Sequence, residues 1–367
     1  MIRILAAPAG NASSIHAYGH GARMVVESTR EEVARLIGAR PEEVVLTGGG
    51  TEANNLAIFG AVAGEPRHGR RVVTSAFEHP SVLEVVGELE EHGTEVVHVT
   101  PDRTGVVPAE AILKEAVPGT LLVSLMLANN ELGTLQPVAA VGRELRRRGV
   151  LLHCDAAHAV GKVAVDVGDL SVDLLSIAGH KFGAPQGAGA LFVRRGLTLH
   201  PHLRGGGQEL NRRPGTENVP AIAGLGAAAA AARRNLELEA RRMVALRDRL
   251  EAALIGRRLG ARVNGVEAPR VPGTSSLAFE GITGESLVIA LDLEGIAVSA
   301  GSACSAGTIR RSPSLLAMGL VEESRSSIRV SLGPGTSEEE IETVAASLEQ
   351  VLDRMRRSAP AAAGSPA

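Results

Sequence analysis

The stretch Leu174-Leu175-Ser176-Ile177-Ala178-Gly179-His180-Lys181-Phe182-Gly183 decides the fold. Its apolar start, Leu174–Ile177, predicts a buried strand, and the glycines that follow predict a tight loop after it. Lys181 lies in that loop, where a lysine is badly placed as a solvated charge and well placed as a desolvated amine that forms a Schiff base. The other two lysines of the chain, Lys114 and Lys162, have ordinary surface settings. The stretch therefore predicts a sheet with a reactive amine at its edge.

On both sides of this stretch, short apolar runs that predict buried strands alternate with longer segments of helical period. The predicted strands are Glu43–Thr47, Arg71–Ser75, Glu95–Val99, Leu121–Leu125, Leu151–Cys154, Leu174–Ile177 and Ala188–Val193. The predicted helices are Glu52–Val62, Pro80–His92, Pro108–Ala116 and Pro137–Arg148. This order is typical of an α/β fold with a mainly parallel central sheet and helices on both faces.

The alternation stops after residue 220, where Ala221–Arg257 predicts one long helix. Beyond it we expect the strands Thr274–Glu280, Ala297–Ser299 and Ser327–Leu332 and the helices Gly284–Leu293 and Ser337–Arg356. The chain should therefore have a large domain over residues 1–236 and a smaller C-terminal α+β domain over residues 237–357. Residues 358–367, rich in Ala, Pro, Gly and Ser, should form a disordered tail.

Composition excludes several classes of function. The 38 basic and 41 acidic residues give a net charge of −3, which argues against nucleic-acid binding, and 2% aromatic residues leave no base-stacking platform. No apolar, uncharged stretch reaches the roughly 18 residues of a membrane helix, so we expect no membrane partner. The two cysteines, Cys154 and Cys304, cannot build a disulfide framework, which favours a reducing, cytoplasmic setting.

Loops after the other predicted strands carry polar residues at the same edge of the sheet. Gly48–Glu52 precedes a helix whose N-terminus could hold a phosphate; the alternative is a glycine-rich turn with a threonine cap. His79 follows another strand, although a lone histidine beside a turn is more often structural. Asp155 ends a buried strand and needs a cation as its partner.

His153, Cys154, Asp155 and His158 suggest a metal site by composition alone. Strand alternation sends Cys154 and Asp155 to opposite faces, so we expect no metal and assign Cys154 to the core. A phosphate cradle, an aspartate that needs a cation and a Schiff-base lysine together describe pyridoxal 5'-phosphate. The aspartate would keep the pyridine nitrogen of this cofactor protonated.

Eight motifs in order resemble those of the NifS/IscS-like cysteine desulfurases, in the class V aminotransferase branch of the fold-type I pyridoxal phosphate enzymes. The resemblance covers about residues 10–352. The motifs are Gly50–Asn55, Asn129–Glu131, Asp155–Lys162, Gly179–Lys181, Gly205–Glu209, Arg213–Asn218, Gly301–Cys304 and Ser327–Gly333. The resemblance implies a cysteine desulfurase that converts L-cysteine to L-alanine and leaves the sulfur as a persulfide on Cys304, for iron–sulfur cluster or thio-cofactor biosynthesis.

The resemblance also implies a role for each matching residue. The catalytic residues are Lys181, which forms the Schiff base, Cys304, and His79, which stacks on the ring. The residues expected to hold the ring are Asp155, Asn130 and His158, and those expected to hold the phosphate are Gly50, Thr51, His180 and Thr216. Thr216 would reach in from the second subunit of a homodimer. Asn130 and Arg329 would bind the substrate carboxylate, and a sulfur-acceptor protein is expected as a partner.

Three departures from the family pattern leave alternatives open. His158 stands where the family usually has Gln, Ala178 replaces a residue that often binds the phosphate, and residues 1–9 lack the Asn-Ala-Ala-Thr-Thr segment of relatives. The alternatives are a selenocysteine lyase, and another class V carbon–sulfur lyase or aminotransferase that needs no cysteine. A third is an inactive scaffold that binds pyridoxal phosphate but has lost activity with the N-terminal segment.

Overall fold

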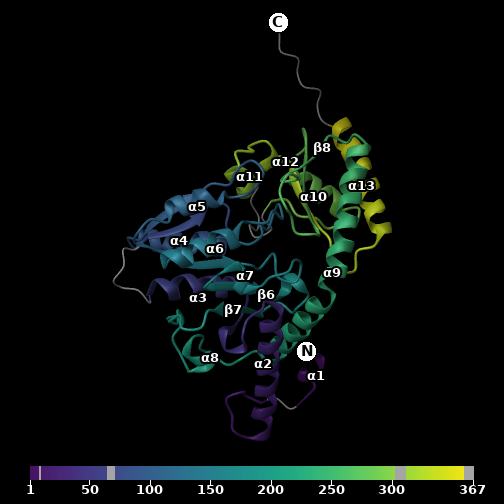
Figure 1. Cartoon of the computed structure of the whole chain (residues 1–367). Coiled ribbons are helices and arrows are strands. Elements are labelled where there is room, and N and C mark those ends of the chain that lie inside the picture. Colours follow the sequence, from purple (N-terminus) through teal and green to yellow (C-terminus); the bar gives the residue numbers. More distant parts are fainter. Residues whose placement is uncertain (8–9, 64–70, 302–310, 359–367) are drawn as a thin grey trace. The chain divides into compact units, whose positions relative to one another are not determined.

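The computed structural model describes residues 1–7, 10–63, 71–301 and 311–358, which form two compact units. Unit 1 comprises Met1–Pro101, Val106–Asn129 and Leu135–Glu237. Unit 2 comprises the chain from Leu238 onward together with two short segments, Asp102–Gly105 and Asn130–Thr134. Figure 1 traces the elements of both units along the chain.

Unit 1 is built on a seven-stranded sheet in the order β1-β7-β6-β5-β4-β2-β3. Its strands are β1 (Val44–Thr47), β2 (Arg71–Ser75), β3 (Glu95–Val99), β4 (Thr120–Ser124), β5 (Leu151–Asp155), β6 (Leu174–Ala178) and β7 (Gly189–Val193). Strand β7 runs antiparallel to both of its neighbours, and the other four pairs are parallel. The predicted α/β fold with a mainly parallel sheet is confirmed, and every predicted strand of this sheet lies within one residue of an observed one.

The described residues of unit 1 contain eleven helical segments, of which the last, α9, continues into unit 2 (Figure 1). They are α1 (Ile2–Leu5), α2 (Ala17–Leu36), η1 (Pro41–Glu43), α3 (Gly50–Ala63), α4 (Pro80–Glu91), α5 (Ala109–Glu115), α6 (Val138–Arg148), α7 (Val167–Leu170), η2 (Gly179–Phe182), α8 (Gln208–Asn211) and α9 (Val219–Gly256). The apolar core between α3, α4 and the sheet includes Ala57, Val82 and Leu122. The predicted helices over residues 52–62, 80–92, 108–116 and 137–148 are present with small shifts of their ends.

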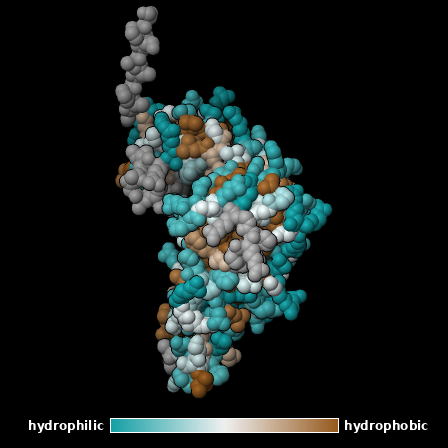
Figure 2. All heavy atoms as spheres, turned by 90° about the vertical axis from the view of Figure 1, so that its left-hand side faces the viewer, coloured by the Kyte–Doolittle hydropathy of each residue, from teal (hydrophilic) through white to brown (hydrophobic). Residues whose placement is uncertain are grey.

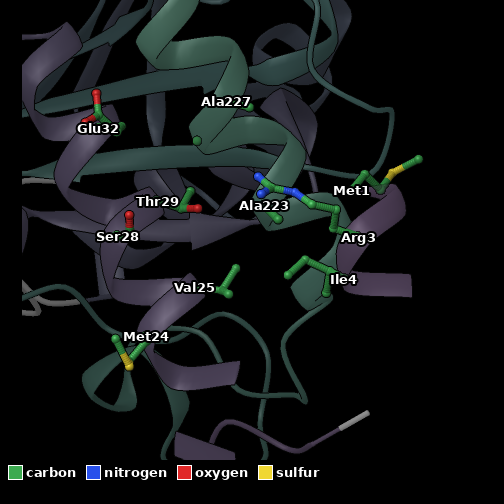
Figure 3. Close-up of a pocket in the computed structure, with 11 residues that line it drawn as sticks. Met1, Arg3, Ile4, Met24, Val25, Ser28, Thr29, Glu32, Ala223 and Ala227 are labelled. Carbon is green, nitrogen blue, oxygen red and sulfur yellow. The ribbon is translucent and has the colours of Figure 1, made fainter. Parts of the chain in front are cut away.

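Helix α2 was not predicted, because its buried face is made largely of small residues such as Gly19 and Ala22 rather than a clear apolar stripe. It packs against α9, where Gly226 is required because a Cβ at that position would lie 2.6 Å from Thr29 Oγ1. Thr29 Oγ1 also donates a hydrogen bond to the carbonyl oxygen of Ile222 (3.1 Å). A groove lined by residues of α1, α2 and α9 runs beside this contact (Figure 3).

Unit 2 contains a three-stranded antiparallel sheet in the order β10-β9-β8. Its elements are β8 (Ala261–Val263), β9 (Thr274–Phe279), α10 (Gly284–Asp292), α11 (Pro313–Ala317), α12 (Glu323–Ser326), β10 (Ser327–Ser331) and α13 (Glu338–Ser358). The C-terminal half of α9 contributes Leu250 and Leu254 to a core that also includes Phe279, Leu287 and Leu348.

One predicted strand of unit 2 is wrong. Ala297–Ser299 forms no strand, because only Ser299 pairs with a neighbour, through a single bridge to Arg329, while Ala297 is exposed. Apart from Ser358, the predicted disordered tail lies outside the described residues. Within the described ranges, no helix is both long enough and apolar enough to cross a bilayer.

Candidate functional site

In unit 1, the loops after β1, β5 and β6 meet at one edge of the sheet. Helix α3 begins at Gly50, and a Cβ on Gly50 would lie 3.1 Å from the Cβ of Ala178 and 3.7 Å from that of Ala157. Ala178 ends β6, and Ala157 follows the last residue of β5 by two positions. The N-terminus of α3, where the phosphate cradle was predicted, therefore lies directly beside the loops that carry Asp155 and Lys181.

Asp155 is the last residue of β5 and is only 5% exposed. Its Oδ1 accepts a hydrogen bond from the backbone N–H of Ala157 (2.9 Å), and its Oδ2 accepts one from Asn54 Nδ2 (2.8 Å). These neutral donors orient a buried carboxylate at the edge of the sheet. A carboxylate held in this way can accept a hydrogen bond from a protonated pyridine nitrogen.

His79 caps the N-terminus of α4 and is half-buried. Its Nδ1 accepts a hydrogen bond from the backbone N–H of Ser81 (3.1 Å) and lies 2.7 Å from Ser81 Oγ. Burial and the positive charge of Lys181 lower the pKa of His79, against the opposing effect of Asp155. The imidazole is therefore kept neutral beside both charged residues.

Lys181 lies on η2, a single turn that begins directly after β6. Its charge acts on both His79 and His180. Partial burial, followed by the positive charge of Lys181, lowers the pKa of His180. The position at the end of a buried strand is as predicted. The prediction of a desolvated amine is wrong for the chain by itself, because η2 leaves the side chain of Lys181 exposed.

His158 is 7% exposed, and its Nδ1 lies 3.2 Å from Lys162 Nζ. A lysine ammonium can only donate, so Nδ1 accepts and the hydrogen of the neutral ring is on Nε2. The sequence placed Lys162 on the surface, but it is half-buried against His158, and this assignment is wrong. The turn after β5 folds back on itself, which brings these two residues together.

The suggested metal ligands are engaged in other contacts. The two ring nitrogens of His153 lie 2.8 Å from Ser124 Oγ and 3.0 Å from Ser176 Oγ, and burial lowers the pKa of His153 to about 4. Cys154 is fully buried, and burial raises the pKa of its thiol well above the usual value. Cys154 therefore has the core position that strand alternation predicts.

Glu78 precedes His79 and is 4% exposed. Its Oε1 accepts hydrogen bonds from Ser75 Oγ (2.6 Å) and from the backbone N–H of Met126 (2.8 Å), while Oε2 has no partner among the described residues. Burial raises the pKa of Glu78 to about 8, since these hydrogen bonds do not offset the loss of water. Glu78 is therefore a protonated acid at neutral pH.

This buried acid predicts a pH dependence of stability. Between its ordinary pKa of 4.5 and about 8, the unfolded chain loses the proton of Glu78 while the folded chain retains it, so stability falls as pH rises through this window. Glu78→Gln should remove this loss of stability, so the Tm of the variant minus that of the parent should increase from pH 5 to pH 8. The expected increase is about 2–4 °C for each kcal/mol of unfolding free energy that the parent loses.

Thermal unfolding followed by circular dichroism across this pH range measures the effect. Glu84→Gln, on the exposed face of α4, is the matched control. Parallel Tm–pH curves for the parent and Glu78→Gln would contradict the assignment of Glu78 as a buried neutral acid.

Two ion pairs hold the loop that carries Thr216. Arg213 Nε lies 2.6 Å from Glu52 Oε1 in the first turn of α3, and Glu52 Oε2 also accepts from the backbone N–H of Gly48 (2.8 Å). Glu209 forms a two-bond contact with Arg30 (2.7 and 2.9 Å) although its backbone φ is +48°, a rare value outside glycine. Thr216 itself is exposed at the surface of unit 1.

Two predicted site residues belong to unit 2, Asn130 and Arg329. Arg329 Nη1 donates to the carbonyl oxygen of Asn130 (2.8 Å), and Nη2 donates to Ser299 Oγ (3.2 Å). Glu131 beside them is buried, which raises its pKa, while hydrogen bonds from Ser312 and Ser314 and the charge of Arg329 oppose this. Cys304 lies outside the described residues.

The sequence did not single out Asn54 or Ser81, which link Asp155 to His79. Asn54 Nδ2 donates to Asp155 Oδ2 and to Ser81 Oγ, both at 2.8 Å. Asn54 comes three residues after Thr51, which is the spacing of neighbours on one helix face. That spacing is the signal that could have placed Asn54 beside the predicted phosphate cradle.

Comparisons with known proteins identify the family of the chain. Residues 2–344 match the class-V aminotransferase family. The cysteine desulfurase IscS of Dictyoglomus turgidum is 39% identical over 352 residues, which cover 96% of this chain and 89% of the relative. A solved NifS-like protein is 34% identical and superposes with a TM-score of 0.87, covering 95% of this chain and 92% of the other. SspA, solved in complex with cysteine, is 33% identical with a TM-score of 0.77, covering 89% and 92%.

Proposed function

The chain belongs to the class-V aminotransferase family, and within it to the cysteine desulfurases, and we propose that it converts L-cysteine to L-alanine with the sulfur retained as a persulfide on Cys304. One structural observation carries the proposal furthest. A buried carboxylate, Asp155, and a lysine, Lys181, follow neighbouring strands of the sheet beside the N-terminus of α3. This arrangement supplies a cation partner, an amine and a phosphate cradle at a single edge.

These residues fit pyridoxal 5'-phosphate by the chemistry of their donor sets. Gly50, Thr51 and His180 would hold its phosphate, Asp155 its pyridine nitrogen and Lys181 its aldehyde carbon. Glycine suits position 50 because a Cβ there would crowd the Cβ of Ala178 at 3.1 Å. When bound, the cofactor supplies an electron sink that weakens bonds at the α-carbon of an amino acid.

The chain's own residues supply the remaining steps of the reaction. The amine of Lys181 would accept the α-proton of the substrate and return it to the α-carbon before alanine leaves. The neutral imidazole of His79 and the Nε2–H of His158 would supply hydrogen-bonding groups beside the ring. Arg329 would bind the substrate carboxylate through its guanidinium fork. The C–S bond of the substrate would break as an S–S bond to Cys304 forms. The β-carbon would take up the proton that the Cys304 thiol gives up, so that the products are alanine and the Cys304 persulfide.

The partners of the reaction follow from the same proposal. Large exposed apolar side chains gather at the N-terminal end of unit 1 and include Ile15 (94% exposed) and Met24 (73%). Figure 2 shows one face of the molecule, on which small hydrophobic patches lie among hydrophilic residues. A second copy of the chain would cover such side chains, and the exposed Thr216 would then reach the partner's phosphate. A sulfur-acceptor protein would take the outer sulfur of the persulfide, and a reducing cytoplasm would keep the Cys304 thiol free of disulfides.

A sulfide-release assay tests the proposed function. Purified protein loaded with pyridoxal phosphate should release equal amounts of alanine and sulfide from L-cysteine in the presence of a thiol reductant. A much higher rate with selenocysteine than with cysteine would favour a selenocysteine lyase. Cofactor absorbance without any alanine would favour an inactive scaffold, and pyruvate as the product would favour a simple lyase.

A further inference from the structure

A chain of hydrogen bonds connects Asp155 at the end of β5 with His79 at the start of α4. Asn54 on α3 lies between them and contacts both Asp155 Oδ2 and Ser81 Oγ through its single nitrogen Nδ2, each at 2.8 Å. Ser81 Oγ in turn lies 2.7 Å from His79 Nδ1. Three elements of unit 1 thus meet through two uncharged side chains, both of them buried.

The direction of the bonds in this chain is fixed from both ends, by the charge of Asp155 and by the backbone N–H that donates to His79. A carboxylate can only accept, so the amide atom of Asn54 that faces Asp155 is the nitrogen, and its second N–H points to Ser81 Oγ. The backbone N–H of Ser81 donates to His79 Nδ1 (3.1 Å), so Nδ1 acts as an acceptor. The Ser81 hydroxyl, 2.7 Å from the same nitrogen, therefore directs its O–H to Nδ1 while its oxygen accepts the hydrogen of Asn54.

The side-chain oxygen of Asn54 is left without a hydrogen bond, which is consistent with this orientation of the amide. Asn54 Oδ1 has no hydrogen-bond partner among the described residues, and Asn54 is 1% exposed. A buried acceptor without a partner destabilises the folded state, and such a group calls for an explanation. The explanation here is that both N–H groups of Asn54 are committed to Asp155 and Ser81.

We propose that Asn54 and Ser81 are positioning residues that transmit the negative charge of Asp155 to His79 and keep the imidazole hydrogen on Nε2. The inference rests on the proposed function, in which Asp155 and His79 hold the cofactor ring. His79 then presents a proton donor, not an acceptor, at Nε2. The burial and the nearby Lys181 that keep the ring neutral make this tautomer the relevant species.

The tautomer of His79 is measured directly by two-bond ¹H–¹⁵N correlation spectra of the full chain labelled with ¹⁵N-histidine, at about pH 8, where an ordinary histidine is neutral. His79→Gln assigns the signal. The parent should show the Nε2–H form. Ser81→Ala should raise the ratio of Nδ1–H to Nε2–H about fivefold, which is the effect of losing one hydrogen bond.

Asn54→Leu should also raise the ratio of Nδ1–H to Nε2–H, and this increase should not exceed the increase caused by Ser81→Ala. The double variant should match Ser81→Ala alone, because Asn54 acts only through the Ser81 hydroxyl. Asn55→Leu is the matched control, since Asn55 is the next residue of α3 and donates to the carbonyl oxygen of Thr51 instead. An unchanged ratio in Ser81→Ala, or additive effects in the double variant, would overturn the inference.

The spectra separate this inference from the proposed function, because they are recorded both with and without added pyridoxal phosphate. A protein that shows the Nε2–H form and the expected shifts but releases no alanine would refute the proposed function and support the role of Asn54 and Ser81. A protein that releases alanine from cysteine, but whose His79 tautomer ratio is unchanged in Ser81→Ala, would refute only the role of Asn54 and Ser81.

Discussion

Cys304→Ser protein should bind pyridoxal phosphate and L-cysteine as the parent does, and release alanine at least about 10³-fold more slowly. Removing the α-proton requires Lys181 and the cofactor, whereas removing the sulfur requires a thiolate that attacks it. A serine hydroxyl is far less acidic than a thiol and cannot hold a persulfide. The variant should therefore separate cofactor chemistry from sulfur transfer, and single-turnover assays of alanine measure the difference.

Cys154→Ser is the matched control for this experiment. The thiol of Cys154 is fully buried in β5, and burial raises its pKa well above the usual value, so it supplies no thiolate. A folded Cys154→Ser protein should retain most of the activity. Full desulfuration of cysteine by Cys304→Ser would refute the persulfide mechanism and favour a lyase that needs no cysteine.

Lys181→Ala should lose both the covalent bond to the cofactor and, by about 10³-fold or more, the turnover of cysteine. The lysine follows β6 on η2, close enough for its charge to lower the pKa of His79 beside Asp155. Borohydride reduction followed by peptide mass analysis should find the cofactor on Lys181 in the parent and on no residue of the variant.

Lys162→Ala and Lys114→Ala are the matched controls. Lys162 contacts His158, so its loss should alter the surroundings of the ring without removing the covalent bond. Lys114 lies on the exposed surface of α5, so Lys114→Ala should change neither the covalent bond to the cofactor nor the turnover of cysteine. A reduced cofactor bound to either of these lysines in the parent would mean that the site is built around another residue than Lys181.

Apolar runs with polar ends predicted the sheet of unit 1 because the central strands β4, β6 and β7 are buried along their whole length. Such strands leave continuous hydrophobic segments in the sequence. The same reasoning placed Asp155 and Lys181 after strands, where side chains of separate loops meet. It failed for Ala297–Ser299, since a short apolar run does not show whether a neighbouring strand is there to pair with it.

The sequence by itself determined the α/β fold, the positions of Asp155 and Lys181 at strand ends, and the burial of Cys154. Only the tertiary structure decided that Lys162 contacts His158, that Glu78 is a neutral acid, and that Asn54 joins Asp155 to Ser81. Asn54 and Asp155 are 101 residues apart in the chain, so their hydrogen bond leaves no periodic pattern. Strand alternation is a local property that a window of sequence contains, whereas the partner and the proton of a buried polar group depend on which elements pack around it.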